Sequence, residues 1–444
     1  MADAAQQLVR MLDELGRVSD EPGRLTRTFL SPAMERANLL VGGWMREAGL
    51  TVREDETGNL IGRLEATVGS PLADAPVARA SSLAHGKPKT LLLGSHLDTV
   101  RNAGRFDGAL GVLLPVVALA GLKRRGVTLP FAVEVLGFSE EEAVRFTGAY
   151  LGSKAYTGRL RAADLKLSDA RGHTLRAVIE AHAGRPFTPP KPAHRQGNLL
   201  GYVEVHIEQG PVLEDRRLAV GVVSAIASQT RGRLTFRGRA GHAGTTPMNL
   251  RHDALAGAAE LVLFAEAYAT ARPPLVATVG TVNVPSGAAN VIPGTAVLSL
   301  DVRHPDDNAC ARALTQLVAQ ARRIARRRGL ALVWQPTMRH AATRCSPALT
   351  AALERSVQAV QGKSLSLVSG AGHDGVVLAA LTPIAMLFVR CRAGLSHHPD
   401  EYASPKDLAT ALRVIVDFLQ RLAADQTANR QSPLISAKAG PSCR

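Results

Sequence analysis

The chain is organised around the stretch Gly94-Ser-His-Leu-Asp-Thr-Val-Arg-Asn-Ala-Gly-Arg-Phe-Asp-Gly-Ala-Leu-Gly111, which follows an apolar run that predicts a short buried strand over residues 90–95. His96 and Asp98 lie two residues apart, so at strand spacing their side chains project to the same side. Asp107 follows in a glycine-flanked loop, just before an apolar helix expected over residues 108–125. Such a set favours a metal site at the carboxyl edge of an α/β sheet, where these folds bind ligands. On these residues alone, loop capping by one His and two Asp explains the pattern equally well.

The segments around this stretch predict a mixed, mostly parallel sheet flanked by helices, which is an α/β fold. A second strand, Phe131–Phe138, follows the helix, and a strand–helix–strand order of this length implies parallel strands. Earlier in the chain the sequence predicts amphipathic helices over residues 3–17 and 33–48 and a strand pair over Thr51–Glu54 and Asn59–Leu64. Residues 66–89 are rich in Ala, Ser and Pro, and we expect an exposed loop there.

A run of three carboxylates, Glu140-Glu141-Glu142, follows the second strand. Adjacent carboxylates repel one another unless cations or protons relieve the repulsion. A helix N-terminus would favour Ser and Glu here without any further function. Because the run stands at the end of a parallel strand, as His96 does, a catalytic interpretation is also open. One Glu would bind a metal ion while its neighbour takes a proton from water.

Two further histidines are candidate ligands. Tyr202, Glu204 and His206 share one face of a predicted strand, and valine and isoleucine side chains share the other. A histidine that ends a strand and faces a pocket can bind a metal ion. His397 follows the strand expected over residues 384–390. Most of the thirteen histidines in the chain are expected to face solvent or to be hydrogen-bonded instead.

From about Val222 the pattern changes to that of a compact insert. The order of a strand, a helix, two strands, a helix and a strand predicts a four-stranded antiparallel sheet with two helices. The expected elements are alternating strands around Ala219–Ala227 and Arg233–Arg237, further strands at Val276–Val282, Ala296–Val302 and Leu330–Gln335, and helices at Asp253–Thr270 and Asn308–Gly329. The chain then returns to the first domain and ends in a helix over residues 404–423. The predicted divisions are 1–221, 222–338, 339–425 and a disordered tail, 426–444.

The formal net charge of +15 raises the alternative of a protein that binds nucleic acid or another polyanion. The basic residues, however, are mostly arginines spread along the chain, and their densest cluster, 322–328, fits a solvated helix face. No nucleic-acid-binding motif is present, so we expect no nucleic-acid partner.

We expect a cytoplasmic protein without a membrane partner, because no run predicts a secretion signal or a membrane span. Four scattered cysteines fit neither a disulfide framework nor a zinc ribbon.

Five motifs that follow or end strands fall in one predicted sheet domain: His96-x-Asp98, Asp107, Glu141-Glu142, His206 and His397. Three histidines with Asp and Glu are the ligand types of a dinuclear site for divalent ions such as Zn²⁺ or Mn²⁺. One aspartate can bridge two such ions at a separation of about 3.5–4 Å. The sequence therefore predicts a site for two divalent metal ions.

With these motifs the sequence resembles the M20-type binuclear metallohydrolases, and within them the amidase/carbamoylase branch. That branch includes allantoate amidohydrolase, N-carbamoyl-L-amino-acid hydrolase and β-ureidopropionase. The resemblance covers roughly residues 5–425, with the five motifs in the family's order. The most telling segment is Gly201-Tyr-Val-Glu-Val-His-Ile-Glu-Gln-Gly-Pro-Val-Leu-Glu214, because the peptidases of the family usually have an acidic ligand there.

The resemblance implies which residues bind the two metal ions. One ion would be held by His96, Asp107 and His206, and the other by Asp107 as a bridge, Glu142 and His397. The family pattern Ser-His-x-Pro favours His397 over its neighbour His398.

The resemblance also implies that Glu141 is the general base and that Asp98 orients His96. The Arg-Phe pair at 145–146 matches the family pattern Glu-Glu-Gly-x-Arg-Phe, which selects Glu141 and Glu142 over Glu140. Ala143 stands where the family has Gly, so the sequence departs from the pattern at that position.

Substrate contacts and assembly are implied in the same way. The expected contacts are Gln209, His242, Asn290, Arg303 and His373. An arginine suits a substrate carboxylate, and His242 would stabilise a developing oxyanion as a catalytic residue. The insert would be a lid and dimerisation domain in a homodimer, and its His242 can reach the partner subunit's site.

The implied activity is hydrolysis of a small ureido acid. Allantoate is the first choice of substrate, with release of ammonia and CO₂, and the alternative is an N-carbamoyl-L-amino acid or N-carbamoyl-β-alanine. A catalytically inactive relative that serves as a binding module is a further alternative. The presence of all five predicted ligands and of the base argues against it.

Overall fold

The structure is a computed structural model that describes residues 2–67, 88–285 and 287–431. The expected loop at 66–89 and the expected tail therefore lie mostly outside the described residues. The described chain forms two compact units. The first contains the chain up to Ser224, Cys345–Leu367 and the residues from His373 onward, and the second contains Ala225–Arg344 with Val368–Gly372. Each unit has its own apolar core.

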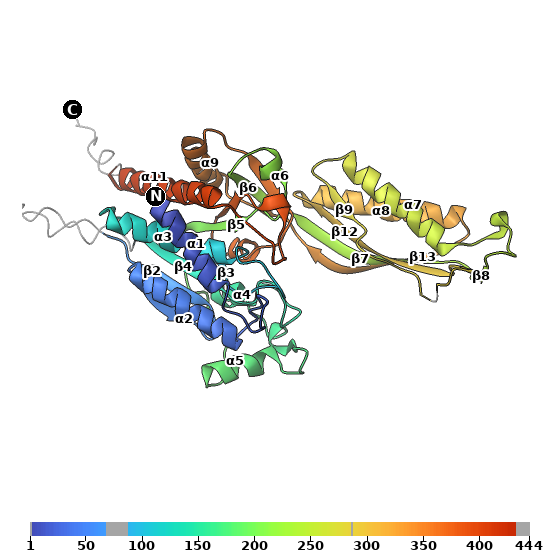
Figure 1. Ribbon diagram of the computed structural model, residues 1–444, viewed down its shortest axis with the longest axis horizontal. Helices are drawn as coiled ribbons and strands as arrows, with labels where there is room; N and C mark the ends of the chain where they lie inside the picture. The colour runs from blue at the N-terminus through green and yellow to red at the C-terminus, as the bar shows by residue number, and fades with distance from the viewer. Residues whose placement is uncertain (1, 68–87, 286, 432–444) are drawn as a thin grey trace, which may run out of the picture. The chain divides into compact units, whose positions relative to one another are not determined.

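A mixed sheet of nine strands organises the first unit (Figure 1). Along the sheet the order is β1 (Thr51–Glu54), β2 (Leu60–Leu64), β4 (Ala132–Phe138), β3 (Thr90–His96), β5 (Leu199–Ile207), β16 (Ile384–Val389), β6 (Val220–Ile226) and β14 (Thr343–Arg344), while β15 (Ser366–Ser369) also pairs with β6. The four central strands, β4, β3, β5 and β16, are parallel, and both β2 and β6 are antiparallel to their central neighbours. The predicted mixed, mostly parallel sheet is confirmed.

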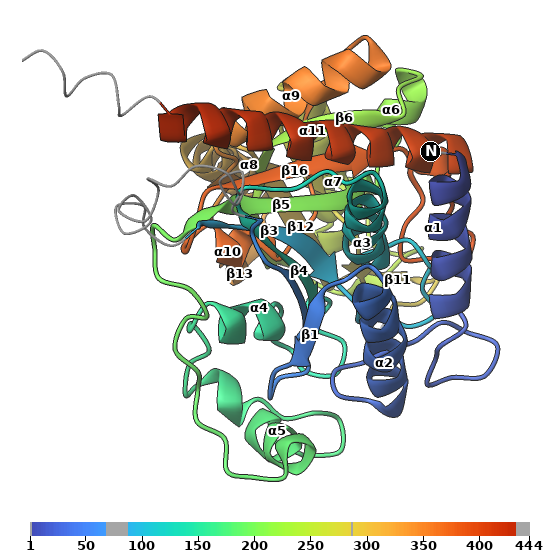
Figure 2. The same ribbon diagram turned by 90° about the vertical axis from the view of Figure 1, so that its left-hand side faces the viewer.

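Five helices form the main apolar core with one face of this sheet (Figure 2). They are α1 (Ala2–Leu15), α2 (Pro32–Glu47), α3 (Ala109–Arg124), α9 (Pro347–Gln361) and α11 (Pro405–Gln431). Helix α3 is buried along most of its length because it contacts α1 and α11 as well as the sheet. Shorter helices complete the unit: α4 (Leu151–Tyr156), α5 (Leu175–Ala183), α6 (Val212–Asp215), α10 (Gly375–Leu378) and 3₁₀ turns at Asp164–Lys166 and Arg392–Gly394.

The strand period of two assigns the core and the site to opposite faces of the sheet. Val203, Val205 and Ile207 of β5 belong to the core shared with the helices, as do Leu91 and Leu93 of β3. The residues of opposite parity therefore project from the other face. These include His96 at the end of β3 and His206 near the end of β5, so the sheet itself places the two imidazoles on one side.

The second unit is an antiparallel sheet with two helices packed on it. Its strand order is β10 (Val282–Asn283), β12 (Thr295–His304), β7 (Ser228–Arg237) and β13 (Ala331–His340), and β9 (Val276–Thr278) also pairs with β12. Helices α7 (Ala254–Thr270) and α8 (Asp307–Arg327) form a core with alternate residues of β7 and β12. A separate pair joins β8 (Gly241–His242) and β11 (Val291–Ile292), and a 3₁₀ turn spans Met248–Leu250.

Three details differ from the sequence prediction. The strand expected over Val276–Val282 is divided into β9 and β10, so this sheet has five strands instead of four. Strand β6 pairs with β16 in the large sheet, so the expected boundary at residue 222 falls inside a strand of the first unit's sheet. Helix α11 continues to Gln431, which makes residues 426–431 of the expected tail helical, while 432–444 lie outside the described residues. Among the residues that the structure describes, no helix has the length and apolar character to cross a membrane.

Candidate metal centre

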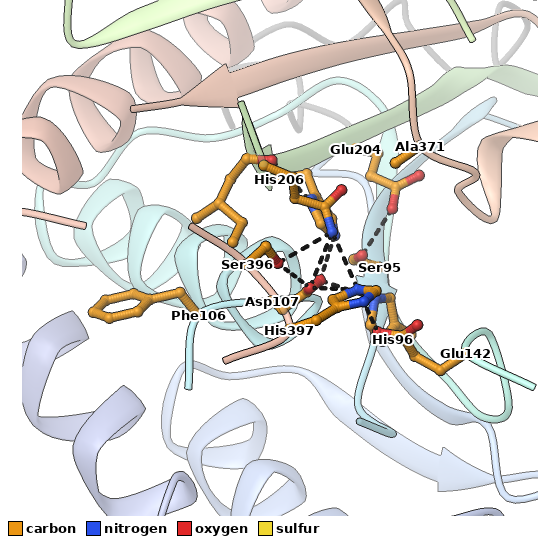
Figure 3. Close-up of polar contacts among 12 residues, drawn as sticks. Ser95, His96, Phe106, Asp107, Glu142, Glu204, His206, Ala371, Ser396 and His397 are labelled. Carbon is orange, nitrogen blue, oxygen red and sulfur yellow. Dashed lines mark hydrogen bonds and ion pairs between the residues drawn. The ribbon is translucent and has the colours of Figure 1, made fainter. Parts of the chain in front are cut away.

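The carboxylate of Asp107 lies between His96 and His206 on one side and His397 on the other. Its Oδ1 is 3.0 Å from His206 Nε2 and 3.6 Å from His96 Nε2, and its Oδ2 is 3.2 Å from His397 Nε2. Figure 3 shows the three imidazole rings gathered around this carboxylate. His96, Asp107 and His206 are buried, whereas the side chain of His397 is 48% exposed. The two oxygens of Asp107 thus face two different sets of nitrogen donors.

The ring nitrogens that face Asp107 carry lone pairs when the imidazoles are neutral. His206 Nδ1 donates to the carbonyl oxygen of Ile207 at 2.9 Å, and His96 Nδ1 donates to that of Asp98 at 3.0 Å, because a carbonyl can only accept. Each neutral ring therefore directs an unprotonated Nε2 at a carboxylate oxygen. Only a proton or a cation between these atoms removes the repulsion.

The donor set fits a pair of divalent cations. Asp107 Oδ1 and His206 Nε2 are buried and have no hydrogen-bond partner among the described residues. Three groups of donors are each close enough to hold one ion, with all ligand atoms within 4.8 Å of one another. They are His96–Asp107–His206, Asp107–Glu142–His397 and His96–Glu141–Glu142. Imidazole with carboxylate is the donor set that zinc and manganese accept.

Glycine is required at the start of helix α3 for the His96 ring to fit. Gly108 has φ +65°, a conformation that other residues adopt only with strain. A Cβ at this position would lie 2.4 Å from the His96 ring. The glycine beside Asp107 therefore makes room for the first imidazole of the centre.

The three consecutive glutamates have different environments, and no helix begins there. Glu140 accepts the backbone N–H groups of Phe29, Arg145 and Phe146, so its role is to hold the loop. Glu141 and Glu142, in contrast, form one of the candidate metal-binding groups with His96. Because residues 139–149 form bends and not a helix, the helix N-terminus interpretation of the run is wrong.

Asp98 holds the loop of the two candidate glutamates. Its Oδ1 and Oδ2 accept the backbone N–H groups of Glu141 and Glu142, each at 3.1 Å. Its backbone carbonyl is the closer partner of His96 Nδ1, since its carboxylate Oδ1 is 3.6 Å away. Asp98 therefore contacts His96, mainly through its backbone carbonyl, and also ties the strand that carries His96 to the glutamate loop.

Without a bound cation, the electrostatics of the cluster raise the pKa of the three candidate ligands His96, His206 and His397 and so favour protons on them. Burial opposes the charged ring, but Asp107, Asp98 and Glu141 raise the pKa of His96 well above its ordinary value. Burial also opposes the charged Asp107, yet His206, His397 and His96 hold the pKa of its carboxyl well below the ordinary range. Burial raises the pKa of Glu141 well above its usual value, and neighbouring Glu142 adds to the effect. A carboxyl with this tendency to hold a proton suits a general base.

Gln209 and His373, both predicted to contact substrate, lie at this cluster. Gln209 adopts a left-handed backbone with φ +55° and donates to Asp107 Oδ2 at 3.0 Å. His373 is 2% exposed, and its ring packs edge-on against that of His206 with centroids 4.6 Å apart. Burial, together with the neighbouring His206, keeps the pKa of His373 well below its ordinary value, so this ring stays neutral.

The other predicted substrate contacts belong to the second unit. His242 lies opposite Val291 in the small strand pair, and the N–H of Ala243 donates to the carbonyl of Asn290 at 2.9 Å. His242 and Asn290 are thus brought together. Arg303, on β12, is bound by Asp301 at 2.9 Å and donates to the carbonyl of Gly370. A substrate carboxylate would compete with Asp301 for this guanidinium.

Two polar residues that contact Asp107 are not among those that the sequence predicts. The Ser396 hydroxyl is 2.7 Å from Asp107 Oδ2, and Glu401 accepts the backbone N–H of Asp107 at 3.0 Å. Both lie next to His397 in the stretch Ser396–Glu401. Their position beside the candidate ligand His397 could have indicated a role at the site. The sequence does not show their contact with Asp107, because Asp107 and Glu401 are separated by 294 residues.

Known proteins of one hydrolase family are similar to this chain over most of its length. The sequence profile of peptidase family M20/M25/M40 matches residues 92–421. A probable allantoate deiminase from Oryza sativa subsp. japonica is 38% identical over 95% of this chain and 89% of its own length. An N-carbamoyl-L-amino acid amidohydrolase from Geobacillus stearothermophilus is also 38% identical, over 94% of this chain and 98% of its own.

A solved structure of the same family has a similar fold over nearly the whole chain. The amidase of the hydantoinase/carbamoylase family from Burkholderia multivorans matches with a TM-score of 0.84 and 31% identity, over 94% of this chain and 98% of that one. The extent of these matches, together with the imidazole–carboxylate centre, shows that the chain belongs to peptidase family M20/M25/M40, in its amidase, hydantoinase/carbamoylase branch.

Proposed function

We propose that this protein is a metal-dependent amidohydrolase that cleaves a C–N bond in the ureido group of a small acid. The observation that carries the proposal is the arrangement at Asp107, whose Oδ1 faces His96 and His206 and whose Oδ2 faces His397. A carboxylate with donors on both sides is suited to bridging two cations. The relatives named for allantoate and for N-carbamoyl-L-amino acids support a ureido or carbamoyl substrate.

Two divalent ions, Zn²⁺ or Mn²⁺, are the cofactors of this proposal. His96, Asp107 and His206 would hold one ion, and Asp107, Glu142 and His397 would hold the other. When bound, such ions lower the pKa of water and stabilise negative charge that develops on a substrate oxygen.

Glu141 is the proposed general base. It accepts a proton as water attacks the ureido carbon, and it passes that proton to the leaving nitrogen as the C–N bond breaks. Its side chain is 8% exposed, and its backbone N–H is held by Asp98, so its position is defined before substrate arrives. The ureido group thereby loses ammonia, and the remaining carbamate releases CO₂.

The proposed substrate contacts are the five residues that the sequence predicts. Gln209 and His373 contribute from the first unit, and His242, Asn290 and Arg303 from the second. Arg303 would bind the substrate carboxylate in place of Asp301, and His242 would stabilise the oxyanion as a catalytic residue. The second unit would act as a lid.

Allantoate is the proposed substrate, and an N-carbamoyl-L-amino acid or N-carbamoyl-β-alanine is the second candidate. The relatives from Oryza sativa and Geobacillus stearothermophilus match the chain at the same identity, 38%, so their similarity favours neither substrate. Short stretches such as Phe138–Phe146 and Ser369–Asp374 favour allantoate by their resemblance to allantoate amidohydrolases.

We further propose that the protein is a cytoplasmic homodimer that associates through its second unit. Large apolar side chains are exposed on that unit, among them Met248 (77%), Leu263 (66%) and Val276 (54%). Exposed apolar side chains of this size are typical of association surfaces when they form a patch. Light scattering on the purified protein would give the mass of one chain if this part of the proposal is wrong.

The test of the activity is a substrate panel. The purified, Mn²⁺-loaded protein is incubated separately with allantoate, an N-carbamoyl-L-amino acid and N-carbamoyl-β-alanine, and the released ammonia is measured. Release from allantoate at the highest kcat/KM supports the first choice. Preference for a carbamoyl amino acid selects the second candidate, and no release from any of them contradicts the proposed activity.

A further inference from the structure

Glu401 joins the loop of His397 to the loop of Asp107. The side chain is almost completely buried, with the residue 2% exposed. Its Oε1 accepts the backbone N–H of Phe106 at 2.8 Å and that of Asp107 at 3.0 Å. Its Oε2 is 3.1 Å from the Ser396 hydroxyl, which is in turn 2.7 Å from Asp107 Oδ2. Glu401 therefore contacts Asp107 directly through the main chain and indirectly through Ser396 (Figure 3 shows Ser396 beside Asp107).

The loop of Asp107 leaves room for this one side chain. A Cβ at Gly104 would lie 2.3 Å from Cβ of Glu401 and 2.5 Å from its Oε1. No side chain of any size fits at residue 104 while Glu401 keeps its place. The glycine and the glutamate thus form a matched pair across two segments that are far apart in the sequence.

The two proposed metal positions are supported differently. His96 and His206 belong to β3 and β5, which are paired strands in the sheet, and both residues are buried. His397 lies in a loop, has a left-handed backbone with φ +57°, and has a half-exposed side chain. The sheet therefore fixes both histidines of the His96–Asp107–His206 position, whereas in the Asp107–Glu142–His397 position the only histidine depends on what holds its loop.

We infer that Glu401 is a positioning residue that fixes the His397 loop against the Asp107 loop and so sets the affinity of the Asp107–Glu142–His397 position for a divalent ion. The inference rests on the proposed function, which supplies the two metal positions. Glu401 itself would contact neither substrate nor metal ion. It acts through Ser396 and through the backbone of Asp107.

The test is a titration of the metal-free protein with Co²⁺, whose visible absorption reports the coordination of each ion. The wild type should bind two ions. Glu401→Leu keeps a buried side chain, one atom shorter, but removes every acceptor, so it should weaken one position at least tenfold and leave the other within about threefold. Glu401→Gln should restore both affinities to within about threefold, because its carbonyl oxygen accepts the two N–H groups and its amide donates to Ser396.

A second variant moves Glu401 without changing its chemistry. Gly104→Ala places a methyl group against the Glu401 side chain, and it should reproduce the selective loss of one ion. Gly121→Ala is the matched control, since a Cβ at Gly121 meets no atom within 4 Å. This control should bind both ions as the wild type does.

The outcomes separate the inference from the function on which it rests. If Glu401→Leu and Gly104→Ala bind both ions with wild-type affinity, the inference is wrong and the proposed metal centre stands. If both positions weaken equally and the metal-free protein also melts at a lower temperature, Glu401 is merely structural and the inference is again wrong. If the wild type binds no Co²⁺, the proposed function falls, and the inference falls with it.

Discussion

The carboxylate of Asp98 accepts the backbone N–H of Glu141 at 3.1 Å, so the residue that contacts the candidate ligand His96 also holds the proposed general base. The second oxygen of Asp98 binds the N–H of Glu142 in the same way. A buried carboxylate with two N–H donors is a strong anchor, because hydrogen bonds to a charged acceptor are stronger than neutral ones. Asp98 therefore couples the position of His96 to that of the glutamate loop.

This coupling predicts the effect of Asp98→Asn. The amide places an NH₂ group against one of the two backbone N–H donors, so the glutamate loop has to shift. Because the supporting residues of metal sites contribute roughly 10–100-fold, we expect kcat to fall by about that factor. Ammonia release at saturating substrate, with the metal content measured in parallel, checks this. A variant with kcat within twofold of the wild type would show that the anchor is dispensable.

Glu141→Gln is expected to separate metal binding from turnover. The glutamine has the same size but cannot accept a proton in the attack of water, so kcat should fall by roughly 10²–10⁴ while both ions are retained. Glu140→Gln is the matched neighbour, because Glu140 contacts only loop atoms among the described residues and should mainly lower the melting temperature. Turnover at the wild-type rate by Glu141→Gln would show that Glu141 is not the general base.

A buried carboxylate away from the metal centre predicts the response to acid. Glu134 is hydrogen-bonded to Arg63, Tyr156 and His194. Burial favours its neutral form, but His194, Tyr156 and Arg63 outweigh burial and lower the pKa of Glu134 to about 2. A lowered carboxyl pKa stabilises the folded state above the pKa of the unfolded chain, and that contribution is lost as the pH falls towards the folded-state value.

Glu134→Gln should therefore lower the melting temperature most at neutral pH. By linkage the loss is about 3 kcal/mol, and the difference from the wild type should narrow as the pH falls from about 5 towards 2. Glu65→Gln is the control, because Glu65 pairs with the same Arg63 but is exposed, and exposed pairs contribute little. A difference that stays constant with pH would contradict the assignment.

The left-handed backbone at Ala143 leads us to expect that glycine at this position stabilises the protein. Ala143 has φ +54°, a left-handed conformation that is unfavourable for a residue with a Cβ. Ala143→Gly should therefore raise the melting temperature, by an amount that corresponds to about 1 kcal/mol. Ala120→Gly, in helix α3, is the matched control and should have the opposite sign. Equal destabilisation by both substitutions would show that the backbone at 143 is not strained.

The parts of the site that were predictable rest on local periodicity. Because side chains alternate along a strand, the sequence alone places His206 and Glu204 on one face of β5 and Val203 and Val205 on the other, as the structure shows. The order of strands and helices was enough to predict the parallel centre of the large sheet. These features depend on residues a few positions apart.

The remaining features depend on contacts between distant segments. Glu140 is separated from Phe29 by 111 residues, and only their contact shows why the first of three glutamates is structural. The same holds for Ser396 and Glu401, whose partners are in the Asp107 loop. The alternating pattern around Ala219–Ala227 predicts a strand at the start of the insert, because it does not reveal that the partner of β6 is β16.

The most direct test of the central claim is anomalous diffraction from crystals of the Mn²⁺- or Zn²⁺-loaded protein. Two ions are expected about 3.5–4 Å apart, one beside each carboxylate oxygen of Asp107. The first should be bound by His96 and His206 and the second by Glu142 and His397. Anomalous peaks elsewhere, or none near Asp107 at saturating metal, would contradict the account.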